Sequence, residues 1–72
     1  MNFPQMLDKI MTERNVSAYR INKEIGMSDR LIGYYRNGEM EPSASNLLKL
    51  AEYFDVSVDY LLGRTEKPEV NR

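Results

Sequence analysis

The sequence predicts an all-α fold in which five short helices pack into one compact bundle. Apolar residues recur three and four positions apart through most of the chain, which is the spacing of residues on one face of a helix. A serine stands just before the expected start of four of the helices, where its oxygen can accept a hydrogen bond from an otherwise unpaired amide. Glycine or asparagine follows the expected end of most of them, as is common where a chain leaves a helix.

The boundaries of the helices follow from these signals. The predicted helices cover about residues 4–14, 18–25, 29–37 and 58–62, with a further helix that ends near residue 54. Pro4 suits the first turn of the first helix, and Asn15 can take the left-handed conformation that ends it. Gly26 and Gly38 end the second and third helices. The fourth helix begins after one of two serines in the segment 43–45, and a break separates it from the last.

A chain of 72 residues can bury only one small core, so we expect a single domain over residues 1–63. Residues 64–72 are polar, contain a proline, and are expected to form a disordered end or the start of a linker. The strongly patterned apolar residues are the expected core: Leu7, Ile10, Ile21, Ile25, Ile32, Leu47, Leu50, Ala51, Phe54, Val56 and Leu61.

The segment 16–42 has the sequence features of a helix-turn-helix. Ile21 and Ile25 lie four positions apart on the first of its helices, and Ile32 and Tyr35 lie three apart on the second. The short turn between these helices contains a glycine. Two apolar stripes joined in this way fold against each other at a steep angle, and the second helix can then enter the major groove of DNA.

The composition argues against several other classes of function. The chain contains no Cys and no His, which removes disulfides, thiolate metal sites and the commonest general base. We therefore expect no catalytic residue, no cofactor, no metal site and no small-molecule substrate. The chain shows no signal peptide and no membrane-spanning stretch, so we expect a cytoplasmic protein without a membrane partner.

One weak metal motif is present. Asp55, Asp59 and Glu66 have the spacing of ligands in a calcium-binding loop, but Tyr60 stands where such a loop needs glycine. The segment is better explained as the start of the last helix.

The net charge of −1 hides an uneven distribution. Residues 14–36 carry five basic and two acidic side chains, a net charge of +3. Residues 1–13 have a net charge of −1 and residues 37–72 a net charge of −3. Positive charge is thus concentrated in the helix-turn-helix segment, which favours binding to phosphates, although such blocks also arise by chance in short charged chains.

Nearly all of residues 5–63 resembles the lambda-repressor-like, Cro/Xre-type helix-turn-helix domain. The matching residues are Val16, Ser17, Ile21, Ile25, Gly26, Met27, Ser28, Ile32, Asn37, Gly38, Pro42, Ser43, Leu47 to Ala51, Phe54, Val56, Ser57, Leu61, Leu62 and Gly63. The resemblance implies a five-helix bundle that binds DNA, usually as a dimer on a two-fold operator and as a repressor.

The resemblance also implies where DNA would be contacted. It places base contacts on the exposed face of the third helix, at Asp29, Arg30, Leu31, Gly33 and Tyr34. It places phosphate contacts at Ser17, Ala18, Tyr19 and Asn37. Arg20 and Lys23 on the second helix are further candidates for phosphate contact, with plain exposure to solvent as the alternative.

The chemistry of the third helix is consistent with base contacts but leaves alternatives open. A guanidinium such as that of Arg30 can bond guanine O6 and N7 together, or it can bind a phosphate instead. Asp29 can accept from a cytosine amino group, or it can simply support the start of the helix. Helical geometry sends Tyr35 toward the core and Tyr34 outward. Gly33 would allow close approach of the backbone to DNA, but a neutral surface change explains it equally well.

Three departures from the family pattern bear on DNA affinity. Ala18 replaces the glutamine that often begins the second helix, and Asn22 replaces the small alanine that usually packs against the third helix. Met11 and Arg36 occupy the positions of an Arg–Glu pair. Losing both partners is less damaging than losing one, because no charge is left unpaired in the interior.

The sequence therefore predicts a sequence-specific double-stranded-DNA-binding protein that inserts residues 29–37 into the major groove. We expect a transcriptional regulator of the phage or mobile-element repressor type, acting as a homodimer on an inverted-repeat operator. The last helix has more apolar residues than one face can bury, so the candidate dimer contacts are Val58, Tyr60 and Leu62.

The alternative is an antitoxin-like or regulatory protein-interaction module that keeps this fold with little affinity for DNA. The acidic overall balance, Asp29, Ala18 and the acidic loop with Glu39 and Glu41 favour this alternative.

Overall fold

The computed structural model describes residues 3–69 of the chain, and within that range it consists of helices and connecting segments, without a strand. The helices are α1 (Phe3–Arg14), α2 (Ala18–Ile25), α3 (Asp29–Asn37), α4 (Ala44–Phe54) and α5 (Val58–Leu61). The all-α five-helix prediction is confirmed. The predicted bounds differ from the structure by one residue at the start of α1 and one at the end of α5.

The helices begin and end with the local interactions that the sequence indicates. Four serines cap the N-termini of α2 to α5, and each side chain accepts a hydrogen bond from the amide three residues further on: Ser17, Ser28, Ser43 and Ser57. Ser43, and not Ser45, therefore caps α4. The segment with calcium-loop spacing forms the capped start of α5. Left-handed residues follow the first four helices: Asn15, Gly26, Gly38 and Asp55.

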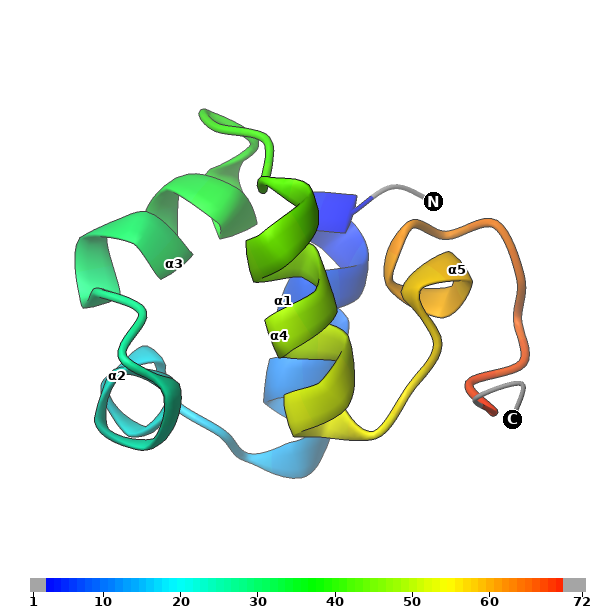
Figure 1. Ribbon diagram of the computed structural model, residues 1–72, viewed down its shortest axis with the longest axis horizontal. Coiled ribbons are helices and arrows are strands. Elements are labelled where there is room, and N and C mark those ends of the chain that lie inside the picture. The colour runs from blue at the N-terminus through cyan, green and yellow to red at the C-terminus, as the bar shows by residue number, and fades with distance from the viewer. Residues whose placement is uncertain (1–2, 70–72) are drawn as a thin grey trace.

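Figure 1 shows α2 and α3 at one end of the molecule and α5 at the other, with α1 and α4 between them. α3 packs against both α1 and α2, and α5 packs against both α1 and α4. The long dimension of the Cα trace is 29 Å. The helix-turn-helix is thus held through α3, which packs on α1 and accepts a hydrogen bond from Asn46 of α4 at the Tyr35 hydroxyl.

The buried core draws residues from every helix and from the connecting segments. The buried residues are Phe3, Met6, Leu7, Ile10, Met11, Ile21, Met27, Ile32, Tyr35, Leu50, Ala51, Phe54, Val56 and Leu61. Nine of the eleven predicted core residues are among them, but Ile25 and Leu47 are only half-buried and pack against the edge of the core. Helical spacing fixes which face of a helix is apolar, but it does not say which turn of that face meets the centre.

Two arginines join helices that are distant in sequence. The Nε of Arg36 on α3 donates to Oδ1 of Asp8 on α1 at 3.0 Å, so Arg36 is paired although its family partner is missing. Arg14 at the end of α1 donates to the carbonyl of Phe54 at the end of α4 and lies 5.8 Å above the Phe54 ring. A cation at a helix C-terminus is favourable because the last carbonyls there are unpaired and partly negative.

The chain after α5 turns back along that helix (Figure 1). The amide of Ser57 donates to the carbonyl of Pro68 at 3.0 Å, and the amide of Arg64 donates to the carbonyl of Asp59 at 2.9 Å. Residues 64–69 therefore lie against α5, where the sequence favours a disordered end or a linker, and residues 70–72 lie outside the described residues. The division of the chain at residue 63 stays a prediction. None of the helices within residues 3–69 has the length and apolar character needed to cross a bilayer.

Two leucines of α4 provide a matched test of the packing. Leu50 is fully buried, whereas Leu48 is 52% exposed. Leu50→Ala should lower the free energy of unfolding by about 2–5 kcal/mol, because it leaves a cavity in the core. Leu48→Ala should change it by less than about 0.5 kcal/mol. Urea denaturation followed by far-ultraviolet circular dichroism measures both, and equal losses for the two variants would contradict this arrangement of α4.

Candidate nucleic-acid interface

The position of α3 relative to α2 is fixed by the short turn and the core residues behind it. Gly26 in the turn has a φ of 77°, a left-handed conformation that glycine adopts without strain. Ile21 on α2 and Ile32 on α3 are both fully buried. Because these side chains point into the core, the opposite faces of the two helices point away from the body of the molecule.

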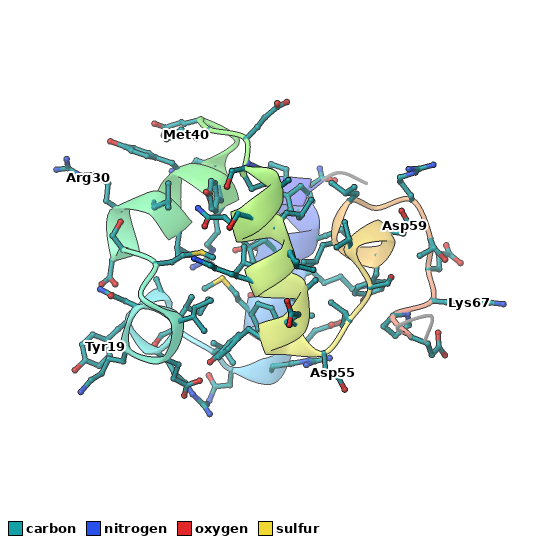
Figure 2. The ribbon with its side chains drawn as sticks, viewed as in Figure 1. Tyr19, Arg30, Met40, Asp55, Asp59 and Lys67 are labelled. Carbon is teal, nitrogen blue, oxygen red and sulfur yellow. The ribbon has the colours of Figure 1, made fainter. Side chains whose placement is uncertain are left out.

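Arg30 stands on the outward face of α3. Its side chain is exposed, and no ion pair or hydrogen bond joins it to another residue within 3–69. Figure 2 shows Arg30 projecting away from the ribbon at the same end of the molecule as Tyr19. A guanidinium presented in this way keeps all five of its donors available to a ligand.

The other predicted base-contact residues differ in exposure. Asp29 is exposed, whereas Leu31, Gly33 and Tyr34 are half-buried, and Leu31 packs against the core. A Cβ atom added at Gly33 would meet nothing within 4 Å, so packing inside the chain does not require glycine at this position. The solvent-facing strip of α3 is therefore centred on Asp29 and Arg30.

A side-chain hydrogen bond crosses the turn between α2 and α3. Nδ2 of Asn22 donates to Oδ1 of Asp29 at 3.3 Å. Both residues are exposed. The asparagine that departs from the family pattern thus makes a specific polar contact with the first residue of α3.

The residues expected to approach phosphates lie at the start of α2 and at the end of α3. Ser17 is the exposed cap of α2, and Ala18 behind it is half-buried. Tyr19 is 61% exposed, and Nζ of Lys23 lies 5.5 Å from the centre of its ring. Asn37 is exposed, and its side-chain amide donates to Glu39 at a long distance of 3.4 Å.

Arg20 belongs to a network that ties α2 to α4. Its Nε donates to Oε1 of Glu24 at 2.9 Å, one helical turn away. The hydroxyl of Tyr53 on α4, followed by Arg20, is the main cause that holds the pKa of the Glu24 carboxyl below its ordinary value. Burial, with the bond to Glu24, raises the pKa of Tyr53. Because Nε of Arg20 already donates to Glu24, only the remaining donors of this guanidinium are available to a phosphate.

Most of the basic side chains in residues 14–36 have partners in the structure and are not free cations. Arg14 is bound at the end of α4, Arg36 is paired with Asp8, and Arg20 with Glu24. Of the five basic residues in 14–36, Lys23 and Arg30 are those without a carboxylate or carbonyl partner among the described residues. The segment with a net charge of +3 therefore presents fewer unpaired cations than its charge indicates, because residues distant in sequence supply partners for its arginines.

The candidate dimer residues lie at the end of the molecule away from α2 and α3 (Figure 1). Val58, Tyr60 and Leu62 are all half-buried and pack against the core. Each keeps part of its side chain on the surface. In the described part of the chain, no group of three or more His, Cys, Asp or Glu side chains is placed to hold a metal ion.

A sequence model of the helix-turn-helix family matches residues 7–61, which include α2, the turn and α3. The chain belongs to the Cro/Xre-type helix-turn-helix family. This family is a class of transcriptional-regulator domains and not a class of enzymes. No solved structure matches the chain significantly.

Curated relatives agree with the family. The HTH-type transcriptional regulator YobD of Bacillus subtilis (strain 168) is 31% identical over 65 residues, covering 90% of this chain and 58% of YobD. The SPbeta prophage-derived HTH-type transcriptional regulator YonR of the same organism is 33% identical over 63 residues, covering 88% of this chain and 58% of YonR.

An HTH-type transcriptional regulator of Haemophilus influenzae is 33% identical over 60 residues, covering 83% of this chain and 25% of that protein. The chain therefore spans little more than half the length of the two Bacillus relatives and a quarter of this one.

Sequence reasoning missed most of the polar contacts around the site. The Arg20–Glu24 pair has the i, i+4 spacing of helical ion pairs and could have been found. The contact between Asp8 and Arg36 joins residues 28 positions apart and leaves no local signal in the sequence. The effect of Tyr53 on the Glu24 pKa joins residues 29 positions apart, which helical periodicity does not reveal.

The Glu24 network predicts a measurable pH dependence. A carboxylate whose pKa is lowered by folding stabilises the fold at neutral pH, and this contribution is lost as the pH falls through the lowered pKa. Tyr53→Phe removes the largest cause of the lowering, so the pKa of Glu24 should rise toward its ordinary value near 4.5. A nuclear magnetic resonance titration of the Glu24 carboxyl measures the change. Tyr60→Phe on α5 is the control, and an unchanged Glu24 pKa in Tyr53→Phe would contradict the network.

Proposed function

We propose that this chain is a sequence-specific DNA-binding domain that inserts α3 into the major groove of double-stranded DNA. The observation that carries the proposal is the outward presentation of Arg30 on a helix whose opposite face is fixed by buried Ile32 and Tyr35. A rigid helix with a free guanidinium in its first turn fits the helix-turn-helix geometry, in which the N-terminal part of the second helix meets base edges.

Base recognition is assigned mainly to Arg30. The guanidinium can bond O6 and N7 of one guanine through two parallel donors, and no other base pair offers that pair of acceptors in the major groove. Asp29, beside it, disfavours phosphates and accepts from amino groups. Tyr34, which is half-buried, supplies an edge that can touch a thymine methyl or a phosphate.

The phosphate contacts are assigned to the start of α2. The first amides of a helix have no intrahelical acceptor and carry partial positive charge, so Ala18 and Tyr19 can donate to a phosphate. Lys23 adds one cation without a carboxylate partner, and Arg20 adds donors that Glu24 leaves free. With so few free cations, one copy of the domain should bind random DNA weakly.

Weak binding by one copy favours a pair of copies on DNA. A two-fold pair reads half-sites about 34 Å apart, one turn of DNA, so the operator should be an inverted repeat. Val58, Tyr60 and Leu62 are the proposed contact between copies, since α5 lies opposite the α2–α3 end. The prophage origin of the relative YonR supports a repressor of phage or mobile-element type.

A protein-interaction module is the second candidate. The loop after α3 carries Glu39 and Glu41 on either side of Met40, which is 45% exposed. An acidic loop with an exposed apolar side chain repels phosphates and suits a basic protein surface. The engagement of three arginines within the fold also favours this candidate.

Arg30→Ala and Lys23→Ala separate base recognition from phosphate binding. Arg30→Ala should lower affinity for a selected duplex by about 1–3 kcal/mol and relax the preference chiefly at one base pair. Lys23→Ala should weaken binding to every sequence about equally and reduce the slope of log K against log salt by roughly one. Fluorescence anisotropy with selected and random duplexes over a salt series measures both effects. If both variants bind as the parent does, the interaction module becomes the better proposal.

Gly33→Ala, at the centre of α3, distinguishes an effect on stability from an effect on the approach of the α3 backbone to DNA. In the free chain the substitution should raise the free energy of unfolding by up to about 1 kcal/mol, because alanine favours helix and its methyl group meets open space. If the backbone of α3 approaches DNA closely, the same methyl group should weaken binding. Thermal unfolding and duplex affinity are measured on one sample. A more stable variant with unchanged affinity would show that Gly33 does not serve DNA approach.

A further inference from the structure

The hydrogen bond between Asn22 and Asp29 lies on the solvent-facing side of the turn between α2 and α3. It joins Nδ2 of Asn22 to Oδ1 of Asp29 at 3.3 Å, and both side chains are exposed. Water competes with an exposed hydrogen bond of this length, so the bond contributes little to folding. Its more direct effect is on the direction of the Asp29 carboxylate.

The carboxylate is held by one oxygen and free at the other. Oδ2 of Asp29 has no hydrogen-bond partner within the described part of the chain. Asp29 is the first residue of α3 and immediately precedes Arg30. The free oxygen therefore sits in the first turn of the helix that is proposed to enter the groove.

An ionised carboxylate can only accept hydrogen bonds. In the major groove the matching edge is the N4 amino group of cytosine, whereas guanine and thymine present acceptors that repel a carboxylate. Adenine also presents an amino group, but the acceptor N7 beside it repels a carboxylate, so cytosine is the better match. A carboxylate that could rotate freely would lose this discrimination, because it could turn away from an unfavourable base at little cost. The hydrogen bond from Asn22 to Oδ1 restricts the rotation of the Asp29 carboxylate.

We infer that Asn22 positions the Asp29 carboxylate and that the two residues together determine the base preference at one position of the bound DNA. The inference rests on the proposed function. Asn22 is a positioning residue in this account, and Asp29 is the residue that touches the base. When DNA covers the pair, water leaves and the bond to Asn22 strengthens, because both oxygens of a desolvated carboxylate need partners.

The test is selection of bound sites from a random duplex library by four chains: the parent, Asn22→Ala, Asp29→Ala and the exchange variant Asn22→Asp/Asp29→Asn. The parent should prefer cytosine at one position of each half-site. Asn22→Ala should reduce that preference several-fold at the same position, change affinity for random duplex less than about twofold, and leave the other positions intact. Asp29→Ala should abolish the preference at that position.

The exchange variant provides the sharpest comparison. It keeps a donor and an acceptor facing each other across the turn but presents a carboxamide to the base, and carboxamides pair with adenine. The preferred base should therefore change from cytosine to adenine at that position alone. Melting temperatures of all four chains should agree within about 8 °C, because an exposed bond contributes little to the fold.

The outcomes separate the inference from the function on which it rests. A parent that enriches no site overturns the proposed function and this inference with it. A parent that enriches a site, with Asn22→Ala keeping the same preference at every position, overturns this inference alone. A uniform loss of preference at all positions in Asn22→Ala also overturns it, because the bond would then be merely structural.

Discussion

The orientation of α3 depends on Tyr35, which connects that helix to α1 and to α4. Its ring is buried and meets the edge of Phe3 on α1, with the ring centres 5.7 Å apart. Its hydroxyl accepts a hydrogen bond from Nδ2 of Asn46 on α4 at 2.9 Å. Tyr35 thus joins α1, α3 and α4 through packing and one satisfied polar contact. Because this side chain must point inward, helical geometry sends Arg30 to the outside.

The same packing determines how much charge is left for a ligand. Arg14 and Arg36 join α1 to α4 and to α3, and Arg20 is paired with Glu24 within α2. Each of these pairs supports the scaffold that carries α3. Few cations in residues 3–69 remain unpaired, so under the proposed function affinity for DNA would come from a small number of well-placed contacts and from two copies acting together.

The helices and most of the core could be predicted from the sequence because caps, glycines and apolar spacing are local signals. Ser17 and Ser28 precede helices because each side chain accepts a hydrogen bond from the amide three residues further on, which is a contact between residues close in sequence. The polar network could not be predicted, since Asp8 and Arg36 are brought together only by the packing of α3 on α1. For the same reason the sequence does not show which cations of the positive segment are paired. Asn22 was recognised only as a departure from the family, and its partner became visible only once the turn had placed Asp29 beside it.

The central claim is that the α2–α3 end of the molecule, presented by the Tyr35 junction, is the surface that binds DNA. Amide chemical shifts of the ¹⁵N-labelled chain, recorded while a duplex selected from a random library is added, test it most directly. The account predicts that the largest shifts fall within residues 17–37 and are greatest around Asp29 and Arg30, with smaller changes at α5 if two copies meet there. Shifts concentrated in the acidic loop at residues 38–42, or on the exposed face of α4, would contradict it.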